Sequence, residues 1–224
     1  LAEPQKKVIV PDLIARLIEQ IAIEARSSEF VDEKSGVSAR LPISAYESVV
    51  SAVERRMILN DEQSGIARVS DLNATIPAIV GKIEMVYEGE QEGAVNVALK
   101  LISEAIKSLA PEYFKGIDRL KSSTGTNPAS QYDEITSWFE NGGEIDLLND
   151  APVKVYEKEL NKVDGLKKTI QIMTDAKGAD ASLLMEFLLH VLAEHSLLDK
   201  RMLEVSYRFQ DYFNSVIKGL GRDN

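Results

Sequence analysis

Cysteine is absent from the 224 residues of this chain, and histidine occurs only twice. Without thiols the protein forms no disulfide and binds no metal through thiolates. Aromatic residues make up only 6% of the chain, and no apolar run approaches the roughly 20 residues that span a bilayer. Since no signal peptide is recognisable either, we expect a cytoplasmic protein without a membrane span.

Basic residues are also in short supply, because 26 Lys and Arg face 36 Asp and Glu, which gives a formal net charge of -10. Nucleic-acid binding needs a basic face, so this balance argues against it. A local basic patch could still form from Arg55, Arg56 and Arg68. The hydrophobic content of 44% is ordinary for a globular protein. The length of 224 residues leaves room for one large or two small domains.

Apolar residues recur every three or four positions along five segments, which is the periodicity of amphipathic helices. These segments are 13–25, 43–57, 95–109, 184–195 and 202–220. Ser70 is placed to cap a further helix that contains Pro77, and Pro111 should end the helix before it. Shorter helices are expected at 153–160 and 166–173. Because no alternation of period two is sustained, the sequence predicts an all-α fold.

The segment that bears most directly on function is Ser35-Gly36-Val37-Ser38-Ala39-Arg40, just before the predicted helix at 43–57. A Gly-x-Ser-x-Arg turn that opens a helix holds a guanidinium near the helix N-terminus, where N–H groups attract an anion. Arginine presents five donors in a rigid fork, which suits a phosphate. The alternative interpretation is a serine-capped helix with an ordinary surface arginine.

The order of features around this turn resembles the helical lid of MoxR-type and magnesium-chelatase-type AAA+ ATPases. A helix precedes the turn, the next helix ends in Glu54-Arg55-Arg56, and Arg68-Val69-Ser70-Asp71 leads into another. Residues 34–56 and 81–93 are similar to the C-terminal half of proteins described as magnesium chelatase subunit I-like. Pro42 departs from the pattern, so we expect this helix to begin later than in a typical lid.

The resemblance implies an AAA+ lid-like helical bundle at 1–86 and a family-specific C-terminal helical region at 87–224. Residues 122–128, rich in turn formers, are a candidate linker within that region. In such a lid Arg40 would be the second sensor arginine, which reaches the terminal phosphates of ATP. The resemblance also implies a homo-hexameric ring and a partner protein, such as a chelatase that inserts Mg2+ into a porphyrin.

No Gly-x-x-x-x-Gly-Lys-[Ser/Thr] loop occurs, because Gly81-Lys82 has Ile76 where the first glycine belongs. The chain also begins at Leu1 rather than at a methionine. We therefore expect a fragment whose ATP and Mg2+ are bound by an N-terminal core outside this chain, and no ATPase activity in the fragment alone. The alternative is a helical protein-interaction module that uses no nucleotide.

Two further groups of residues are candidates for a site. Ser38, Arg55 and Arg56 could contact nucleotide or a neighbouring subunit, although plain surface charge also explains the arginines. An acidic, glycine-containing stretch could hold a hard cation, offer a docking surface, or be a solvated loop that leads into a helix. Its glutamates are Glu84, Glu88, Glu90 and Glu92.

The remaining polar and aromatic candidates have structural explanations. His190 and His195 are five residues apart, or about 140° around a helix, which does not suit a zinc site. We expect His195 to continue the apolar face of its helix and His190 to lie off it. Trp138-Phe139 is predicted to anchor the core.

Overall fold

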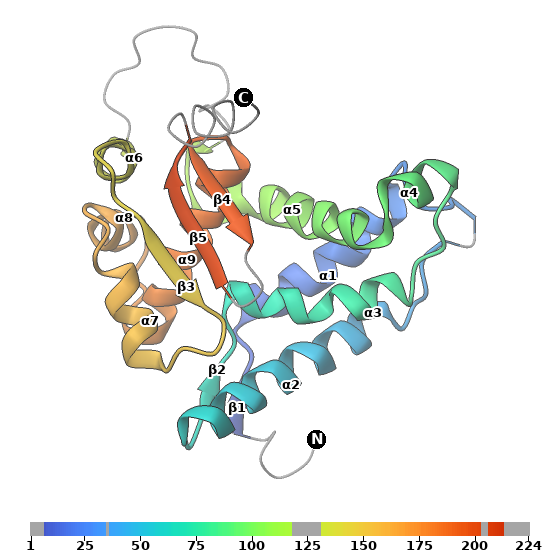
Figure 1. The fold of residues 1–224 in the computed structure, drawn as a ribbon, viewed down its shortest axis with the longest axis horizontal. Coiled ribbons are helices and arrows are strands. Elements are labelled where there is room, and N and C mark those ends of the chain that lie inside the picture. Colours follow the sequence, from blue (N-terminus) through green and yellow to red (C-terminus); the bar gives the residue numbers. More distant parts are fainter. Residues whose placement is uncertain (1–6, 35, 118–130, 203–205, 213–224) are drawn as a thin grey trace, which may run out of the picture. The chain divides into compact units, whose positions relative to one another are not determined.

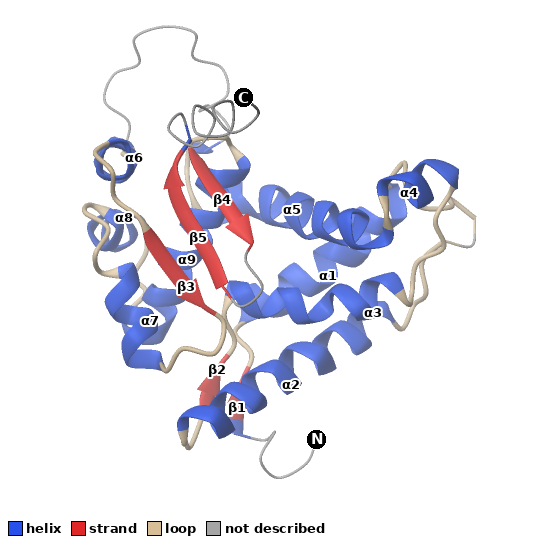
Figure 2. Ribbon diagram, viewed as in Figure 1, coloured by secondary structure: helices blue, strands red, loops and turns tan. Residues whose placement is uncertain are grey.

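The computed structural model of the chain describes residues 7–34, 36–117, 131–202 and 206–212. Most of these residues are helical, as the apolar spacing predicts (Figure 2). The chain divides into two compact units, Leu1–Leu109 and Ala110–Asn224. The domain boundary expected after residue 86 falls within the first unit, and the candidate linker at 122–128 lies outside the described residues. No helix in the described ranges is both long and apolar enough to cross a membrane.

The first unit contains helices and one pair of short parallel strands (Figure 1). Its elements are β1 (Val8–Ile9), α1 (Asp12–Ser27), α2 (Leu41–Asn60), β2 (Gly65–Ile66), the 3-10 helix η2 (Val69–Thr75), α3 (Ile76–Val80), α4 (Tyr87–Glu92) and α5 (Ala94–Tyr113). The last residues of α5 belong to the second unit. β1 and β2 pair in register, with Val8 opposite Gly65 and Ile9 opposite Ile66.

Helix α2 is the central element of the first unit, because it contacts α1, η2, α3 and both strands. α1 begins after Pro11, and Asp12 in its first turn suits the positive end of the helix dipole. Its buried face has the three- and four-residue spacing that the sequence predicts. β2 lies close against α2 at Gly65, where an added Cβ would come within 2.5 Å of the Val53 side chain. The core of this unit therefore forms around α2.

The second unit combines helices with a three-stranded antiparallel sheet (Figures 1 and 2). Its elements after α5 are α6 (Asp133–Glu140), β3 (Ile145–Leu148), α7 (Val153–Leu160), α8 (Leu166–Met173), α9 (Gly178–Glu194), β4 (Leu198–Met202) and β5 (Ser206–Asp211). β5 lies between β3 and β4. Arg208 on β5 donates to both carboxylate oxygens of Asp146 opposite it on β3, at 2.8 and 3.0 Å.

The sheet shows that the all-α prediction is wrong in detail, although the chain is mostly helical. A helix was expected from residue 202, but β4 and β5 occupy the described part of that segment. In β5, Tyr207 and Phe209 are buried and the residues between and after them are partly exposed, which is the alternation of a strand. Met202 and Phe209 are seven positions apart, which also fits a helix, and this coincidence explains the error. Residues 213–220 lie outside the described residues.

Pro111 and Ser70 also differ from expectation, whereas Pro77 lies within a helix as expected. Pro111 does not end α5, which continues to Tyr113, and the Phe114 N–H still donates to the Ala110 carbonyl at 2.9 Å. Ser70 lies within η2 rather than capping it. Pro77 lies in the first turn of α3, where a missing N–H costs no helical hydrogen bond.

The aromatic pair in α6 is placed as predicted. Phe139 is fully buried, and Trp138 meets it edge to face, with ring centroids 4.9 Å apart. Gly143 passes so close to the indole that an added Cβ would lie 2.2 Å from it. Trp138 and Phe139 therefore anchor the core of the second unit.

Candidate functional site

The Gly-x-Ser-x-Arg turn leads directly into α2 and leaves Arg40 exposed at the N-cap position. Ser38 closes the turn, because its Oγ accepts from the Arg40 N–H at 3.2 Å and its carbonyl accepts from the Leu41 N–H at 3.0 Å. Pro42 lies in the first turn, where helical N–H groups have no intrahelical partner anyway. The later helix start that we expected from Pro42 is therefore wrong.

A distant segment of the chain holds this turn in place. The Ser38 N–H donates to the Lys82 carbonyl at 2.9 Å, and the Glu84 N–H donates to the Gly36 carbonyl at 2.8 Å. The approach is close, because a Cβ on Gly36 would lie 2.0 Å from the carbonyl oxygen of Asp32. Only glycine fits there. The backbone that carries Arg40 is thus fixed by hydrogen bonds formed across more than forty residues.

This arrangement favours an anion at the start of α2. The 20 residues of α2 make a helix about 30 Å long, whose N-terminus carries a partial positive charge. The side chain of Arg40 is exposed beside that terminus. A phosphate there would therefore meet two sources of positive charge, the guanidinium and the helix end.

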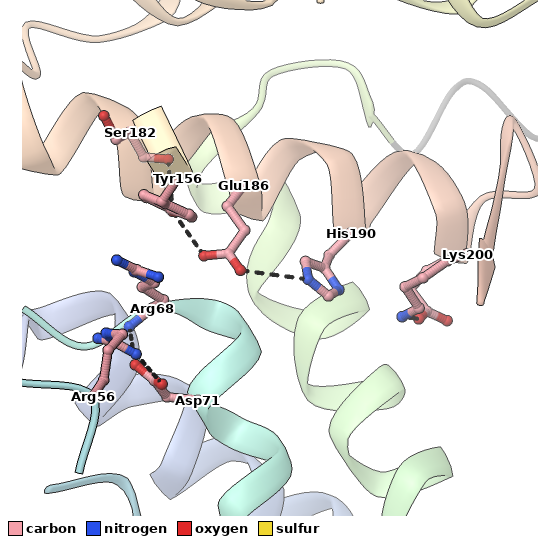
Figure 3. Close-up of polar contacts among 9 residues, drawn as sticks. Arg56, Arg68, Asp71, Tyr156, Ser182, Glu186, His190 and Lys200 are labelled. Atoms are coloured by element: carbon pink, nitrogen blue, oxygen red, sulfur yellow. Dashed lines mark hydrogen bonds and ion pairs between the residues drawn. The ribbon is translucent and has the colours of Figure 1, made fainter. Parts of the chain in front are cut away.

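The two arginines near the other end of α2 lie in different environments. Arg55 is exposed, whereas Arg56 is only 2% exposed. Its guanidinium pairs with Asp71 at 2.5 Å (Figure 3). It also donates to the Ile66 carbonyl at 2.8 Å. The prediction that Arg56 contacts nucleotide or a neighbouring subunit is therefore wrong. Arg68 is buried as well, so the basic patch considered above does not form.

Asp71 is the buried counter-ion of Arg56, a role that the sequence analysis did not assign to it. One carboxylate oxygen pairs with Arg56, and the other accepts from the Arg68 N–H at 2.7 Å, where it caps η2. The signal was present in Arg68-Val69-Ser70-Asp71, because an acid three residues into a helix commonly bonds the backbone at the helix start.

Arg40 and Arg55 lie too far apart to share one ligand. At 1.5 Å per residue, they are separated by about 22 Å along α2.

The four glutamates of the acidic stretch do not converge. Glu84, Glu88 and Glu90 are exposed, and Glu92 pairs with Lys100 at 3.0 Å. Among the residues that the structure describes, no three His, Asp or Glu side chains could hold a metal ion together. The geometry thus gives no support to a cation site, while the exposed acids remain open to a docking role.

A buried polar cluster in the second unit was also missed. The Tyr156 hydroxyl of α7 donates to the carboxylate of Glu186 on α9 at 2.9 Å, and Glu186 is fully buried (Figure 3). His190 lies one helical turn further on and is 1% exposed, whereas His195, at the end of α9, is partly exposed. The expected placement of the two histidines is therefore wrong. The four-residue spacing of Glu186 and His190 was the available signal.

No protein-family model matches the chain, and comparisons with curated proteins and with solved structures give no significant match. A function must therefore be argued from the chain's own residues. The turn at Arg40 combines an exposed cation at a helix N-terminus with a backbone fixed by long-range hydrogen bonds.

Replacing Arg56 should destabilise the first unit strongly. Arg56→Ala leaves the buried Asp71 carboxylate without its counter-ion, and breaking a buried pair in this way costs about 3–5 kcal/mol. Arg55→Ala, one residue earlier and exposed, should change the free energy of unfolding by less than about 1 kcal/mol. Urea unfolding of both variants measures the difference. Equal effects at the two positions would show that the Arg56–Asp71 pair does not stabilise the fold.

Gly89 in α4 should not tolerate alanine, although alanine favours helices by about 1 kcal/mol. An added Cβ would lie 2.4 Å from the Phe30 carbonyl oxygen, a backbone atom that cannot move aside. We expect Gly89→Ala to lower the free energy of unfolding by about 1–3 kcal/mol. Glu90→Ala, exposed on the same helix, is the control and should stay within about 0.5 kcal/mol of wild type. A Gly89→Ala variant as stable as wild type would mean that α4 can move away from Phe30.

Proposed function

We propose that this chain is the lid and C-terminal helical region of a ring-forming AAA+ ATPase that resembles magnesium chelatase subunit I. In this proposal Arg40 is the second sensor arginine, and it reaches the terminal phosphates of ATP. The observation that carries the proposal is the exposed Arg40 at the N-cap of α2, on a turn held by backbone hydrogen bonds.

The proposed mechanism is electrostatic. Charge that develops on a transferring phosphoryl group is stabilised most by donors whose positions are fixed beforehand. Ser38 helps to fix the position of Arg40, because its Oγ accepts a hydrogen bond from the Arg40 N–H and thereby holds the turn. The guanidinium then closes over nucleotide bound elsewhere, and the N-terminus of α2 adds to its attraction for phosphate.

ATP and its Mg2+ are bound, in this proposal, by a nucleotide-binding core that is not among these 224 residues. The sequence supports this division because it contains no Walker A loop to cradle the phosphates. The core and the lid would act together in a cytoplasmic homo-hexameric ring. In this proposal Arg55, which is exposed about 22 Å along α2 from Arg40, contacts a neighbouring subunit rather than the same nucleotide.

A second candidate function is a protein-interaction module that uses no nucleotide. It is favoured by apolar side chains on the outside of α2, where Ile43 is 61% and Ile58 is 72% exposed. Ile58 and Leu59, both exposed, are adjacent near the C-terminal end of α2 and supply contiguous apolar surface there, whereas Ile43 lies about 22 Å away along the helix. The acidic residues Glu88 and Glu90 would offer a separate surface to a basic partner. The ATPase assay of Arg40→Ala described below distinguishes this module from a lid.

The chain by itself should neither hydrolyse ATP nor bind it tightly. In the proposed core lie the loop that cradles the phosphates, the lysine that contacts them and the ligands of Mg2+. This chain therefore has only one arginine and the N-terminus of a helix with which to bind ATP. Isothermal calorimetry of the 224 residues with Mg-ATP should therefore show no binding in the micromolar range. Micromolar affinity would overturn the division between core and lid and would require a complete nucleotide site within this chain.

Arg40→Ala should abolish most ATP turnover in the ring formed by this chain and its core, while it leaves the fold intact. A residue that stabilises charge on a transferring phosphoryl group is worth about 10³–10⁵ in rate. An exposed side chain without such a task changes stability by less than about 0.5 kcal/mol. Steady-state ATPase assays and thermal melting of the variant measure the two quantities. Part of the loss is expected as weaker nucleotide binding.

Lys34→Ala provides a matched control, because Lys34 is an exposed cation just before the same turn. It should change neither turnover nor melting. If turnover of Arg40→Ala stays within a factor of about two of wild type, like that of the control, Arg40 is no sensor. The interaction module would then be the better proposal, since an arginine that stabilises charge on a transferring phosphoryl group is worth about 10³–10⁵ in rate.

A further inference from the structure

The centre of the second unit is a helix that is buried on all sides. Every residue of α9 from Ser182 to Leu192 is buried, and the helix contacts α7, α8 and β4. Two ionisable side chains lie in this segment, Glu186 and His190, which are 0% and 1% exposed. Ionisable groups are rarely fully buried unless they are paired, so their surroundings decide what they do.

His190 is surrounded by aromatic rings rather than by hydrogen-bonding partners. The rings of Tyr207 and Phe209 on β5 meet it edge to face, at centroid distances of 4.8 and 5.2 Å. The imidazole Nε2 is 3.9 Å from Glu186 Oε1, which is too long for a hydrogen bond. Within the described residues, neither ring nitrogen of His190 has a hydrogen-bond partner.

The charged and titratable groups around this imidazole come from four elements. On α9 itself, Glu186 accepts from Tyr156 of α7 through its other oxygen. Lys200 on β4 has its Nζ 5.8 Å from the Tyr207 ring centroid and donates to Glu194 at 2.5 Å. On β5, Tyr207 contacts the imidazole directly, and Asp211 follows Phe209 on the same face of the strand. None of these groups forms a hydrogen bond with either ring nitrogen of His190 in the described part of the chain.

We propose that His190 is an acid-sensitive switch of the second unit: its protonation drives the imidazole away from the rings of Tyr207 and Phe209, against which it packs, and separates β4 and β5 from α9. The neutral ring packs as an aromatic side chain, whereas a buried imidazolium without an acceptor is costly. β5 is the central strand of the sheet and supplies both rings, so displacement of His190 acts on the whole sheet.

The direction of the pH dependence follows from the environment of the ring. Burial, together with the positive charge of Lys200, lowers the pKa of His190 well below its usual value of 6.5. The opened or unfolded unit therefore binds the proton more readily than the folded one. Stability is complete above about pH 6.5 and falls as the pH is lowered from there towards the folded pKa, by about tenfold in the unfolding constant per pH unit.

Glu186 offers the competing outcome. If the carboxylate moved about 1 Å closer to Nε2, it would form an ion pair with protonated His190 and oppose the switch. Two considerations disfavour that pair: both groups are fully desolvated, so the attraction must exceed two desolvation costs, and Glu186 is already held by the Tyr156 hydroxyl.

The composition of the chain allows a clean test, because Trp138 is its only tryptophan and it lies in the second unit. Urea unfolding followed by Trp138 fluorescence, from pH 7.5 to 5, should show the unfolding constant of wild type rising about tenfold per unit below pH 6.5, relative to His190→Phe. The phenylalanine keeps the ring contacts and cannot be protonated. His195→Gln, which changes the only other histidine, should retain the wild-type pH dependence.

Two results would overturn the proposal. One is the same pH dependence in wild type and His190→Phe, since the carboxylates contribute equally to both. The other comes from His195→Gln, which leaves a single imidazole signal in a proton NMR titration of the folded chain. We expect that signal not to shift between pH 7.5 and 5.5. A midpoint at or above 6.5 would show that Glu186 pairs with protonated His190. This measurement decides the question even if His190→Phe does not fold.

Discussion

The buried ion pair between Arg56 and Asp71 is the constraint on which the first unit depends. The Arg56 guanidinium joins α2 to η2 through Asp71 and to β2 through the Ile66 carbonyl. Asp71 in turn caps the start of η2. Three elements that are separate in sequence thus meet at one charge pair, which is strongly directional where an apolar contact is not. The pair sets the placement of η2 and α3 against α2, and residues 82–84, which follow α3, hold the turn at Arg40.

Much of the helical content could be predicted from the sequence because it depends on local spacing. The apolar repeats of α1 and α2 appear in the chain itself, and so do the limits of α7 and α8. The sheet of the second unit could not be predicted in the same way. Its central strand β5 is defined by partners far away in sequence, β3 above all, and its apolar residues happen to fit a helical repeat as well. The pairing of strands leaves no signal in the sequence, and the period-two alternation of β5 itself covers only a few residues.

The site was predictable in part, and for the same reason. The Gly-x-Ser-x-Arg turn is a local motif, so the exposure of Arg40 at the start of a helix could be anticipated. The fates of Arg56 and His190 could not, because both depend on what lies opposite them. A surface arginine and a buried one look alike in a helix sequence until a carboxylate such as Asp71 is placed. His190 looked like the polar side of α9, but that helix has no polar side between Ser182 and Leu192.

The two ends of α2 show how one residue type takes on opposite roles. Arg56 has its charge neutralised inside the protein, so it contributes rigidity and is not available to a ligand. Arg40 is exposed next to a helix end that repels its charge and attracts anions. A cation in that position is unfavourable until an anion joins it. Because Arg40 is exposed, its long side chain relieves this repulsion by extending into solvent or by meeting an anion at the start of the helix.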